Sequence, residues 1–247
     1  MGMAERVTEI AGLKIRENTD LLCVGTDSLL CAAYVRPSSK AKAVELGSGN
    51  GIISLLCLKR NKLASVNAVE IDPEAAELCR RNGDENGFSP RITVFCGDIR
   101  ELIPSEHIGT SVVISNPPYM KTESGKECKS GQMENARHEH NGDIYDFCRA
   151  AARLLKTGGS FYAVYRPDRL PALTDALIQN RLSPKRMTFV HSDEFHSPSS
   201  VLIEARKDGG EAVYVTPPLI LKRGDADSEE LTYIYENGSF PRKFFAP

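Results

Sequence analysis

The sequence predicts an α/β fold: a doubly wound, mostly parallel sheet of seven strands that ends in an antiparallel strand. Three observations predict it. From residue 43 onward, short apolar runs alternate with amphipathic helical runs, which is typical of parallel strands joined by crossover helices. A glycine-rich turn follows the first of these strands. Two apolar strands in direct succession, 185–191 and 201–206, predict an antiparallel hairpin that finishes the sheet.

Local patterns predict each element in turn. Residues 5–25 alternate loosely and indicate a small hairpin, and Thr26 or Asp27 is a candidate N-cap for a helix that Pro37 ends. The further strands are expected at 43–46, 66–70, 92–95, 111–115 and 160–165. The further helices are expected at 52–61, 73–86, 143–156 (stopped by Gly158-Gly159) and 168–180.

These elements divide the chain into three parts. Residues 1–40 form an N-terminal hairpin and helix, residues 41–207 form the catalytic domain, and residues 208–247 form a C-terminal tail. Asn237-Gly238 is typical of a hairpin turn, so a short hairpin is expected in the tail.

Composition excludes several classes of function. The 247 residues carry a formal net charge of −2, so nothing in the overall charge attracts nucleic acid. Seven scattered cysteines without C-x-x-C spacing indicate a reducing compartment, and we expect no metal site, since His138 and His140 form only a lone H-x-H. The N-terminus lacks the apolar core of a signal peptide, and no apolar run approaches the roughly 20 residues of a membrane span. A cytoplasmic location is expected.

A nucleoside pocket is predicted where the first strands of the sheet end. The first strand leads into Glu45-Leu46-Gly47-Ser48-Gly49-Asn50-Gly51, and the second ends at Glu70, followed by Ile71. Glycines in such a turn let a ligand approach the backbone, and an acidic residue about 20 positions later can accept ribose hydroxyls. Because an acid precedes the first glycine, the turn favours a ligand with an amine or sulfonium cation over a pyrophosphate.

The stretch Asn116-Pro117-Pro118-Tyr119 follows a buried apolar strand and predicts a site for a planar amine. The Asn116 side-chain oxygen and the Pro117 carbonyl can accept the two protons of such an amine. The prolines restrict φ and lack competing N–H donors, while the Tyr119 ring offers a face for stacking. These groups would catalyse by positioning and electrostatics.

Both stretches resemble motifs of known enzymes. The glycine turn resembles motif I of the class I S-adenosylmethionine-dependent methyltransferases, and N-P-P-Y resembles motif IV of the amino-methyltransferases. The resemblance implies S-adenosyl-L-methionine as cofactor, with Asp98 in "CGDI" at the adenine edge. The cofactor contacts expected from the motifs and from the resemblance together are Glu45, Gly47, Gly49, Glu70, Ile71, Asp98, Ile99, Asn116 and Asp27.

Longer stretches narrow the resemblance to one family. "VGTDSLL" (24–30), "ARHEH" (136–140) and "FVHSDEFHSPSSVLIEARK" (189–207) are similar to the bacterial tRNA-valine adenine-37 N6-methyltransferase family, especially its Gram-positive branch. That resemblance implies methylation of an adenine in a tRNA anticodon loop, with catalytic roles for Asn116, Pro117 and Tyr119. Pro118, Tyr119, Arg137 and His138 are the expected substrate contacts.

The alternative functions are methyl transfers of the same kind to other acceptor molecules. A protein glutamine-N5 methyltransferase uses N-P-P-Y on a planar amide, and ribosomal RNA or DNA adenine is a third possibility. Since overall charge is −2, an RNA substrate requires a local basic patch, for which Arg166, Arg169, Lys185 and Arg186 are candidates. Oligomeric state does not follow from the sequence.

Overall fold

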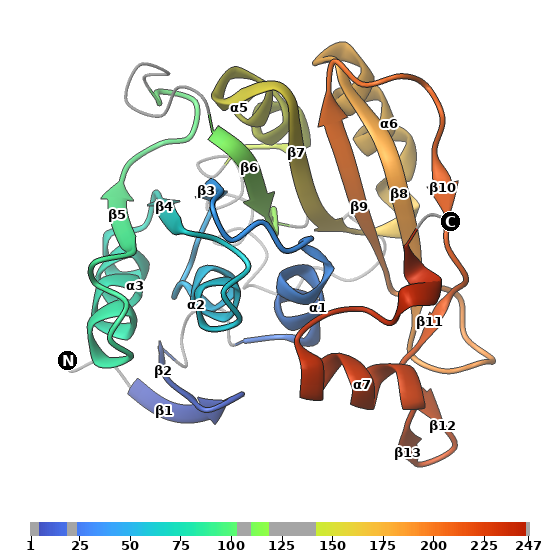
Figure 1. The fold of residues 1–247 in the computed structure, drawn as a ribbon, viewed down its shortest axis with the longest axis horizontal. Helices are drawn as coiled ribbons and strands as arrows, with labels where there is room; N and C mark the ends of the chain where they lie inside the picture. Colours follow the sequence, from blue (N-terminus) through green and yellow to red (C-terminus); the bar gives the residue numbers. More distant parts are fainter. Residues whose placement is uncertain (1–4, 19–23, 103–109, 119–141, 246–247) are drawn as a thin grey trace, which may run out of the picture.

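The sheet of the computed structural model has the predicted topology at its centre. The structure describes residues 5–18, 24–102, 110–118 and 142–245. In these residues the main sheet has nine strands in the order β10-β8-β9-β7-β6-β3-β4-β5, and β11 also pairs with β8. The strands from β7 to β5 are parallel, and β9 is antiparallel to both β7 and β8. The seven expected strands are therefore confirmed, and the two further ones, β10 and β11, are short (Figure 1).

The strands are β1 Glu5–Ile10, β2 Leu13–Asn18, β3 Lys42–Leu46, β4 Ser65–Glu70, β5 Ile92–Cys96, β6 Thr110–Ser115, β7 Leu155–Tyr165, β8 Leu182–His191, β9 Ser200–Lys207, β10 Tyr214–Val215, β11 Leu219–Ile220, β12 Lys222–Arg223 and β13 Ala226–Asp227. The helices are α1 Thr26–Tyr34, α2 Ile52–Lys59, α3 Pro73–Glu85, α5 Ile144–Leu154, α6 Leu170–Gln179 and α7 Glu229–Asn237, with short 3₁₀ turns η2 Pro167–Arg169 and η3 Arg242–Phe244.

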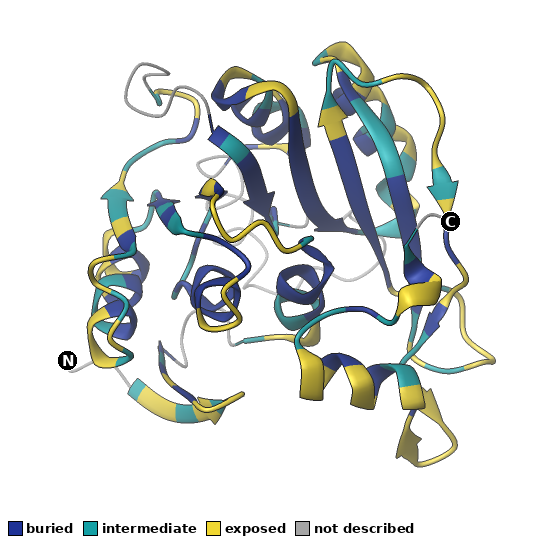
Figure 2. Ribbon diagram, viewed as in Figure 1, coloured by how far each residue is buried: buried dark blue, intermediate teal, exposed yellow. Residues whose placement is uncertain are grey.

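Two apolar cores lie on opposite faces of the sheet. One joins the sheet to α1, α2, α3, the β1–β2 hairpin and α7, and the other joins it to α5 and α6. Figure 2 shows that the central strands are mostly buried. Helix α2 is buried on nearly every side from Ile52 to Leu58, whereas α3, α5, α6 and α7 are exposed on the side away from the sheet. Burial on both faces explains why these strands are continuous apolar runs in the sequence.

Three local predictions were wrong in detail. The N-cap of α1 is Gly25, so Thr26 is already helical. Gly158-Gly159 does not stop a helix: α5 ends at Leu154, and the two glycines lie inside β7 beside an irregularity in its pairing with β6. Asn237-Gly238 ends a helix, because Gly238 is in the left-handed conformation of a C-cap. The hairpin of this region is β12–β13 instead.

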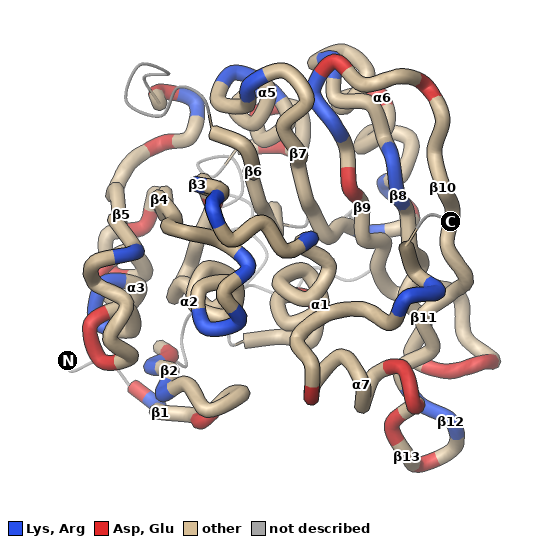
Figure 3. The backbone as a smooth tube through the Cα atoms, viewed as in Figure 1, with Lys and Arg blue, Asp and Glu red and all other residues tan. Residues whose placement is uncertain are grey.

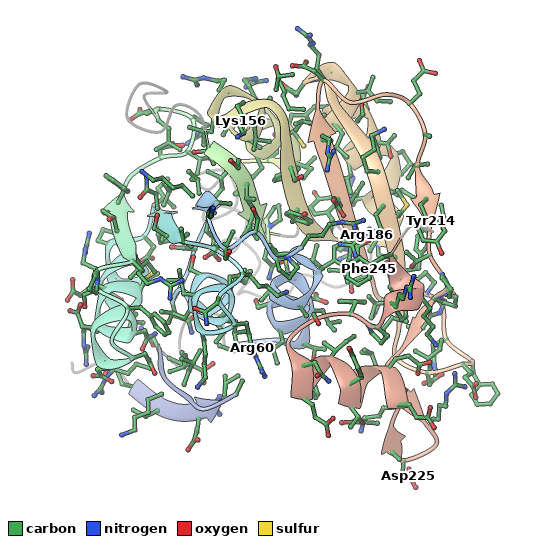
Figure 4. The ribbon with its side chains drawn as sticks, in the orientation of Figure 1. Arg60, Lys156, Arg186, Tyr214, Asp225 and Phe245 are labelled. Atoms are coloured by element: carbon green, nitrogen blue, oxygen red, sulfur yellow. The ribbon has the colours of Figure 1, made fainter. Side chains whose placement is uncertain are left out.

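The residues after β9 close over a buried ionic cluster. Glu204, 2% exposed, accepts from Arg36 Nε at 2.9 and 3.0 Å and forms an ion pair with Arg186 Nε at 3.0 Å. The Arg186 guanidinium lies 3.6 Å from the centroid of the Tyr34 ring and 4.8 Å from that of Phe245, and Figure 4 shows Arg186 and Phe245 adjacent. Arg186 is fully buried, so it cannot belong to a surface RNA patch.

Candidate functional site

The motif residues meet at one edge of the sheet because four parallel strands end in register. Leu46 of β3 pairs with Ser115 of β6 on one side and with Val69 of β4 on the other. Glu70, the last residue of β4, pairs with Cys96 of β5. Four segments predicted as site residues therefore leave the sheet side by side: the glycine turn, Glu70-Ile71, Asp98-Ile99 and the N-P-P segment. This is the carboxyl edge, where ligands bind in open α/β sheets.

The glycine turn is held against β4 and is open on its outer side. Gly47 and Ser48 donate their backbone N–H groups to the Val69 carbonyl at 2.9 and 3.0 Å. Gly49 has φ +52°, and a Cβ placed there would meet nothing within 4 Å. At Gly51, with φ +84°, a Cβ would lie 2.6 Å from Cys79 Sγ. Gly51 is thus required by packing, whereas Gly49 leaves backbone accessible to a ligand.

The Glu70 carboxylate links this turn to the end of β4. Its Oε2 accepts from Gly49 N at 2.7 Å and its Oε1 from Asp72 N at 2.9 Å. Burial raises the pKa of Glu70, while backbone N–H groups of Asp72, Gly49 and Ile71 oppose that shift. A carboxylate has about four acceptor positions, so at least one remains for a ribose hydroxyl. The chemistry of this group and the open turn beside it fit S-adenosyl-L-methionine.

Glu45 occupies a different environment although it belongs to the same motif. It is 1% exposed, and its Oε2 accepts from both the backbone N and the hydroxyl of Ser54 in α2. Burial raises the pKa of Glu45 to about 8. Its predicted contact with the cofactor amine stays a prediction.

Asp98 follows β5 and is paired with Arg100. It accepts from the backbone N of Arg100 at 2.8 Å and from Arg100 Nε at 2.8 and 2.9 Å. These hydrogen bonds keep the pKa of Asp98 below its usual value, so the carboxylate is ionised at neutral pH. Arg100 was missed by sequence reasoning. Ile99 is buried in the core beneath this turn.

Asn116 lies where β6 ends, next to the glycine turn. Ser115 Oγ donates to the Leu46 carbonyl at 2.8 Å, which fastens the end of β6 to β3. The Asn116 amide donates from Nδ2 to Ser28 Oγ in α1 at 3.2 Å. Ser28 lies one residue after Asp27, which occupies the first turn of the same helix. Tyr119, Arg137 and His138 lie outside the described residues.

A cavity of about 220 Å³ lies elsewhere, between the β1–β2 hairpin, α1, α2 and α7. It contains none of the motif residues, and its lining is largely apolar apart from Arg60. In the described part of the chain, no group of three or more His, Cys, Asp or Glu side chains is arranged to hold a metal ion. No helix there is long and apolar enough to cross a membrane.

The fold and this arrangement of strand-end motifs define a class I S-adenosylmethionine-dependent methyltransferase. The chain belongs to the methyltransferase small domain family, whose model matches residues 19–177. S-adenosyl-L-methionine is its cofactor, which confirms the prediction from the motifs.

Relatives of known name support the narrower resemblance. The chain is 32% identical to a tRNA1(Val) (adenine(37)-N6)-methyltransferase of Bacteroides fragilis (strain YCH46) over 181 residues, which cover 73% of this chain and 75% of the relative. It is 27% identical to a protein of the same name from Shigella dysenteriae serotype 1, over 84% of this chain and 83% of the relative. The family resemblance seen in the sequence is confirmed; its Gram-positive branch stays a prediction.

Solved structures confirm the fold. A predicted O-methyltransferase, Atu636 from Agrobacterium tumefaciens, is similar with a TM-score of 0.71 at 21% identity, covering 87% of this chain and 98% of that one. M. jannaschii TYW2, in complex with AdoMet, has a TM-score of 0.58 at 13% identity, covering 83% of this chain and 87% of that one.

Proposed function

We propose that this enzyme transfers a methyl group from S-adenosyl-L-methionine to N6 of an adenine in a tRNA anticodon loop. The observation that carries the proposal is the position of Asn116, at the end of β6, in register with the glycine turn. The names of the relatives supply the tRNA and the position of the adenine. Pairing in a duplex uses N6, whereas a loop adenine can be extruded at lower cost.

The residues of the chain divide the work between two halves of the site. Gly49, Glu70 and Asp98 would hold the cofactor, which when bound supplies an electrophilic methyl group. The Asn116 Oδ1 and the Pro117 carbonyl would accept the two protons of the exocyclic amine. Holding both protons directs the nitrogen lone pair toward the methyl group, which is catalysis by positioning and preorganised dipoles. As the new nitrogen–methyl bond forms, the methyl group's bond to sulfur breaks, and the nitrogen becomes cationic and strongly acidic. It then releases one of its two protons to water, so neither a metal ion nor a general base with a shifted pKa is required.

RNA recognition in this proposal depends on local contacts. Figure 3 shows Lys and Arg residues interspersed with Asp and Glu over most elements rather than gathered on one. Of the four candidates for a basic patch, Arg186 is buried and Lys185 donates to the Ala212 carbonyl at 3.2 Å. Arg166 and Arg169 follow β7 at the same edge as Asn116. Arg166 is paired with Asp168 at 2.9 Å, so RNA would have to compete with that carboxylate for it. Arg137 and His138 are proposed as further contacts, and Pro118 and Tyr119 as the stacking surface. The reduced cysteines and a tRNA substrate fit the cytoplasm.

The test is direct identification of the methylated product. Purified protein is incubated with labelled S-adenosyl-L-methionine and either bulk tRNA or a release factor, and the products are digested and analysed by mass spectrometry. We expect N6-methyladenosine from tRNA, abolished in Asn116→Ala. Label in a release-factor glutamine, with none in tRNA, would refute the proposal in favour of a protein methyltransferase. Ribosomal RNA and adenine-containing DNA are tested in parallel reactions.

A further inference from the structure

Helix α1 contacts the end of β6 at two points on one of its faces. Ser28 Oγ accepts from Asn116 Nδ2 at 3.2 Å. One turn later, Cys31 Sγ donates to the Ser115 carbonyl at 3.7 Å. Residues three apart on a helix share a face, so this face of α1 is seated against both the backbone and the side chain at the predicted acceptor site.

The contact matters because an asparagine amide has two unlike ends. One end is an acceptor and the other a double donor. With Nδ2 toward Ser28, Oδ1 occupies the opposite end of the amide, which is the end that accepts from a substrate amine in the proposed reaction. With the amide reversed, its N–H groups would face the N–H groups of that amine, which is unproductive. The hydrogen bond that Asn116 donates to Ser28 Oγ therefore constrains the plane of the amide.

Ser28 can hold the Asn116 amide only if helix α1 is itself fixed. Contacts at both ends of α1 fix it. Where the chain enters α1, Val24 N donates to the buried carboxylate of Glu17 at 2.6 Å. At the other end, Arg186 Nη2 donates to the Tyr34 carbonyl at 2.6 Å.

A buried lysine adds a second anchor at the C-terminal end of α1. Lys62 is 2% exposed, and its ammonium donates to three carbonyls at 2.8 Å each, those of Ala32, Ala33 and Val35. Carbonyls in the last turn of a helix lack partners within the helix, and this one side chain satisfies three of them. A side chain on such a fixed helix can hold a neighbouring group with the precision that transfer chemistry requires.

We propose that Ser28 is a positioning residue for methyl transfer: its hydroxyl holds the Asn116 amide in the plane in which Oδ1 accepts from the target amine. This rests on the proposed function, because it assumes a planar amine acceptor at Asn116. Ser28 acts through Asn116 and is not itself catalytic.

The first test compares three single variants in single-turnover methylation of tRNA. Ser28→Ala should slow methyl transfer roughly 2- to 12-fold, the range for loss of one neutral hydrogen bond. Ser28→Thr keeps the hydroxyl and should restore most of the rate. Thr26→Ala is the matched control, because Thr26 lies in the same turn and its hydroxyl bonds Tyr235 instead. Cofactor affinity should be unchanged in all three. Each alanine variant loses one hydrogen bond, so their melting temperatures should fall by similar small amounts, whereas only Ser28→Ala should slow methyl transfer; a merely structural role for Ser28 would not separate the two variants in rate.

The second test is a double-mutant cycle with Asn116→Ala. If Ser28 acts through the amide, Ser28→Ala should have no further effect once the amide is gone. An equal loss in both backgrounds, or an unchanged rate in the single variant, would overturn the positioning role. Failure of the proposed function is a separate outcome, since the wild-type enzyme would then leave tRNA adenine unmethylated. The same cycle is then measured on the acceptor that the wild-type enzyme does methylate.

Discussion

Two buried carboxylates, Glu70 in β4 and Glu204 in β9, are stabilised by different means in the two halves of the sheet. Glu70, 8% exposed, is held by backbone N–H groups of Gly49 and Asp72 and keeps acceptor capacity toward the open glycine turn. Glu204, 2% exposed, is held by the guanidinium groups of Arg186 and Arg36. Tyr162 adds a hydroxyl contact at 3.4 Å.

The difference separates a binding group from a structural one. Backbone N–H groups offset the cost of burying the Glu70 carboxylate without occupying all of its acceptor positions. The carboxylate can therefore still accept a hydrogen bond from a ligand. Arg186 pairs with Glu204 across the neighbouring strands β8 and β9. Arg36 lies 168 residues away in the chain, so its ion pair fastens the second half of the sheet to the segment after α1. We infer that loss of Glu70 impairs binding, whereas loss of Glu204 impairs folding.

The largest effect is expected from Glu204→Ala. Removing one member of a buried ion pair leaves the other charge without compensation, which costs about 3–5 kcal/mol. In Glu204→Ala, the fully buried Arg186 would be left with an uncompensated charge. For a chain of this size we expect the melting temperature to fall by roughly 6 to 20 °C, measured by calorimetry. Glu204→Gln is the control: it keeps the shape of the side chain and one acceptor oxygen, so its melting temperature should fall less. A normal melting temperature for Glu204→Ala would show that the cluster is not structural.

Asn116→Ala should give the next largest effect, and on rate instead of stability. Loss of one preorganised polar group at a reacting centre costs on the order of 10²–10³ in rate. The Asn116 amide bonds Ser28 at the open edge of the sheet, so the fold should persist. Cofactor affinity should stay nearly intact, because Gly49, Glu70 and Asp98 would still hold the cofactor. Single-turnover methylation, calorimetric titration with the cofactor and a melting curve measure the three quantities. A rate above about a third of wild type would refute the two-acceptor mechanism.

The same contrast explains how much could be predicted from the sequence. That Gly49, Glu70 and Asp98 lie together was predictable because each lies at or within three residues of the end of a strand, and parallel strands bring their carboxyl ends together. Ser28 lies in the stretch VGTDSLL (24–30). Its contact with Asn116 spans 88 residues of the chain, so no local pattern predicts it. Arg186 was considered a surface candidate because a charged residue is rarely buried; only the packing of Tyr34 and Phe245 against it reveals its environment.

Glu70→Ala tests the open carboxylate. Hydrogen bonds to charged groups contribute about 1.5–3 kcal/mol, so the affinity for S-adenosyl-L-methionine should fall roughly 10- to 150-fold. Gly49 N would also lose the acceptor that it has at 2.7 Å, which loosens the turn. Calorimetric titration measures the affinity, and Glu77→Ala, an exposed carboxylate of α3 paired with Arg80, is the matched control. Unchanged affinity in Glu70→Ala would remove Glu70 from the ribose role.

Glu45→Gln gives the smallest expected effect and tests the predicted contact with the cofactor amine. Burial raises the pKa of Glu45 to about 8, so the carboxyl is about one-tenth ionised at pH 7 and about nine-tenths at pH 9. A cationic ligand binds the ionised form better. The ratio of wild-type to Glu45→Gln affinity should therefore rise up to about 10-fold between these pH values. Titration of the cofactor itself affects both proteins equally, so it cancels in this ratio.

The raised pKa of Glu45 also predicts that the stability of the ligand-free protein falls as pH rises, whereas its relative affinity for the cofactor rises. Because the folded pKa of Glu45 lies above its ordinary value of 4.5, the folded state holds a proton that the unfolded state releases. The wild-type free energy of unfolding should then fall as pH rises from about 4.5 to about 8, while that of Glu45→Gln lacks this component. Urea unfolding at several pH values measures it. If the stability component is present but the affinity ratio does not change with pH, Glu45 is a buried support of the Ser54 end of α2 and does not face the cofactor amine.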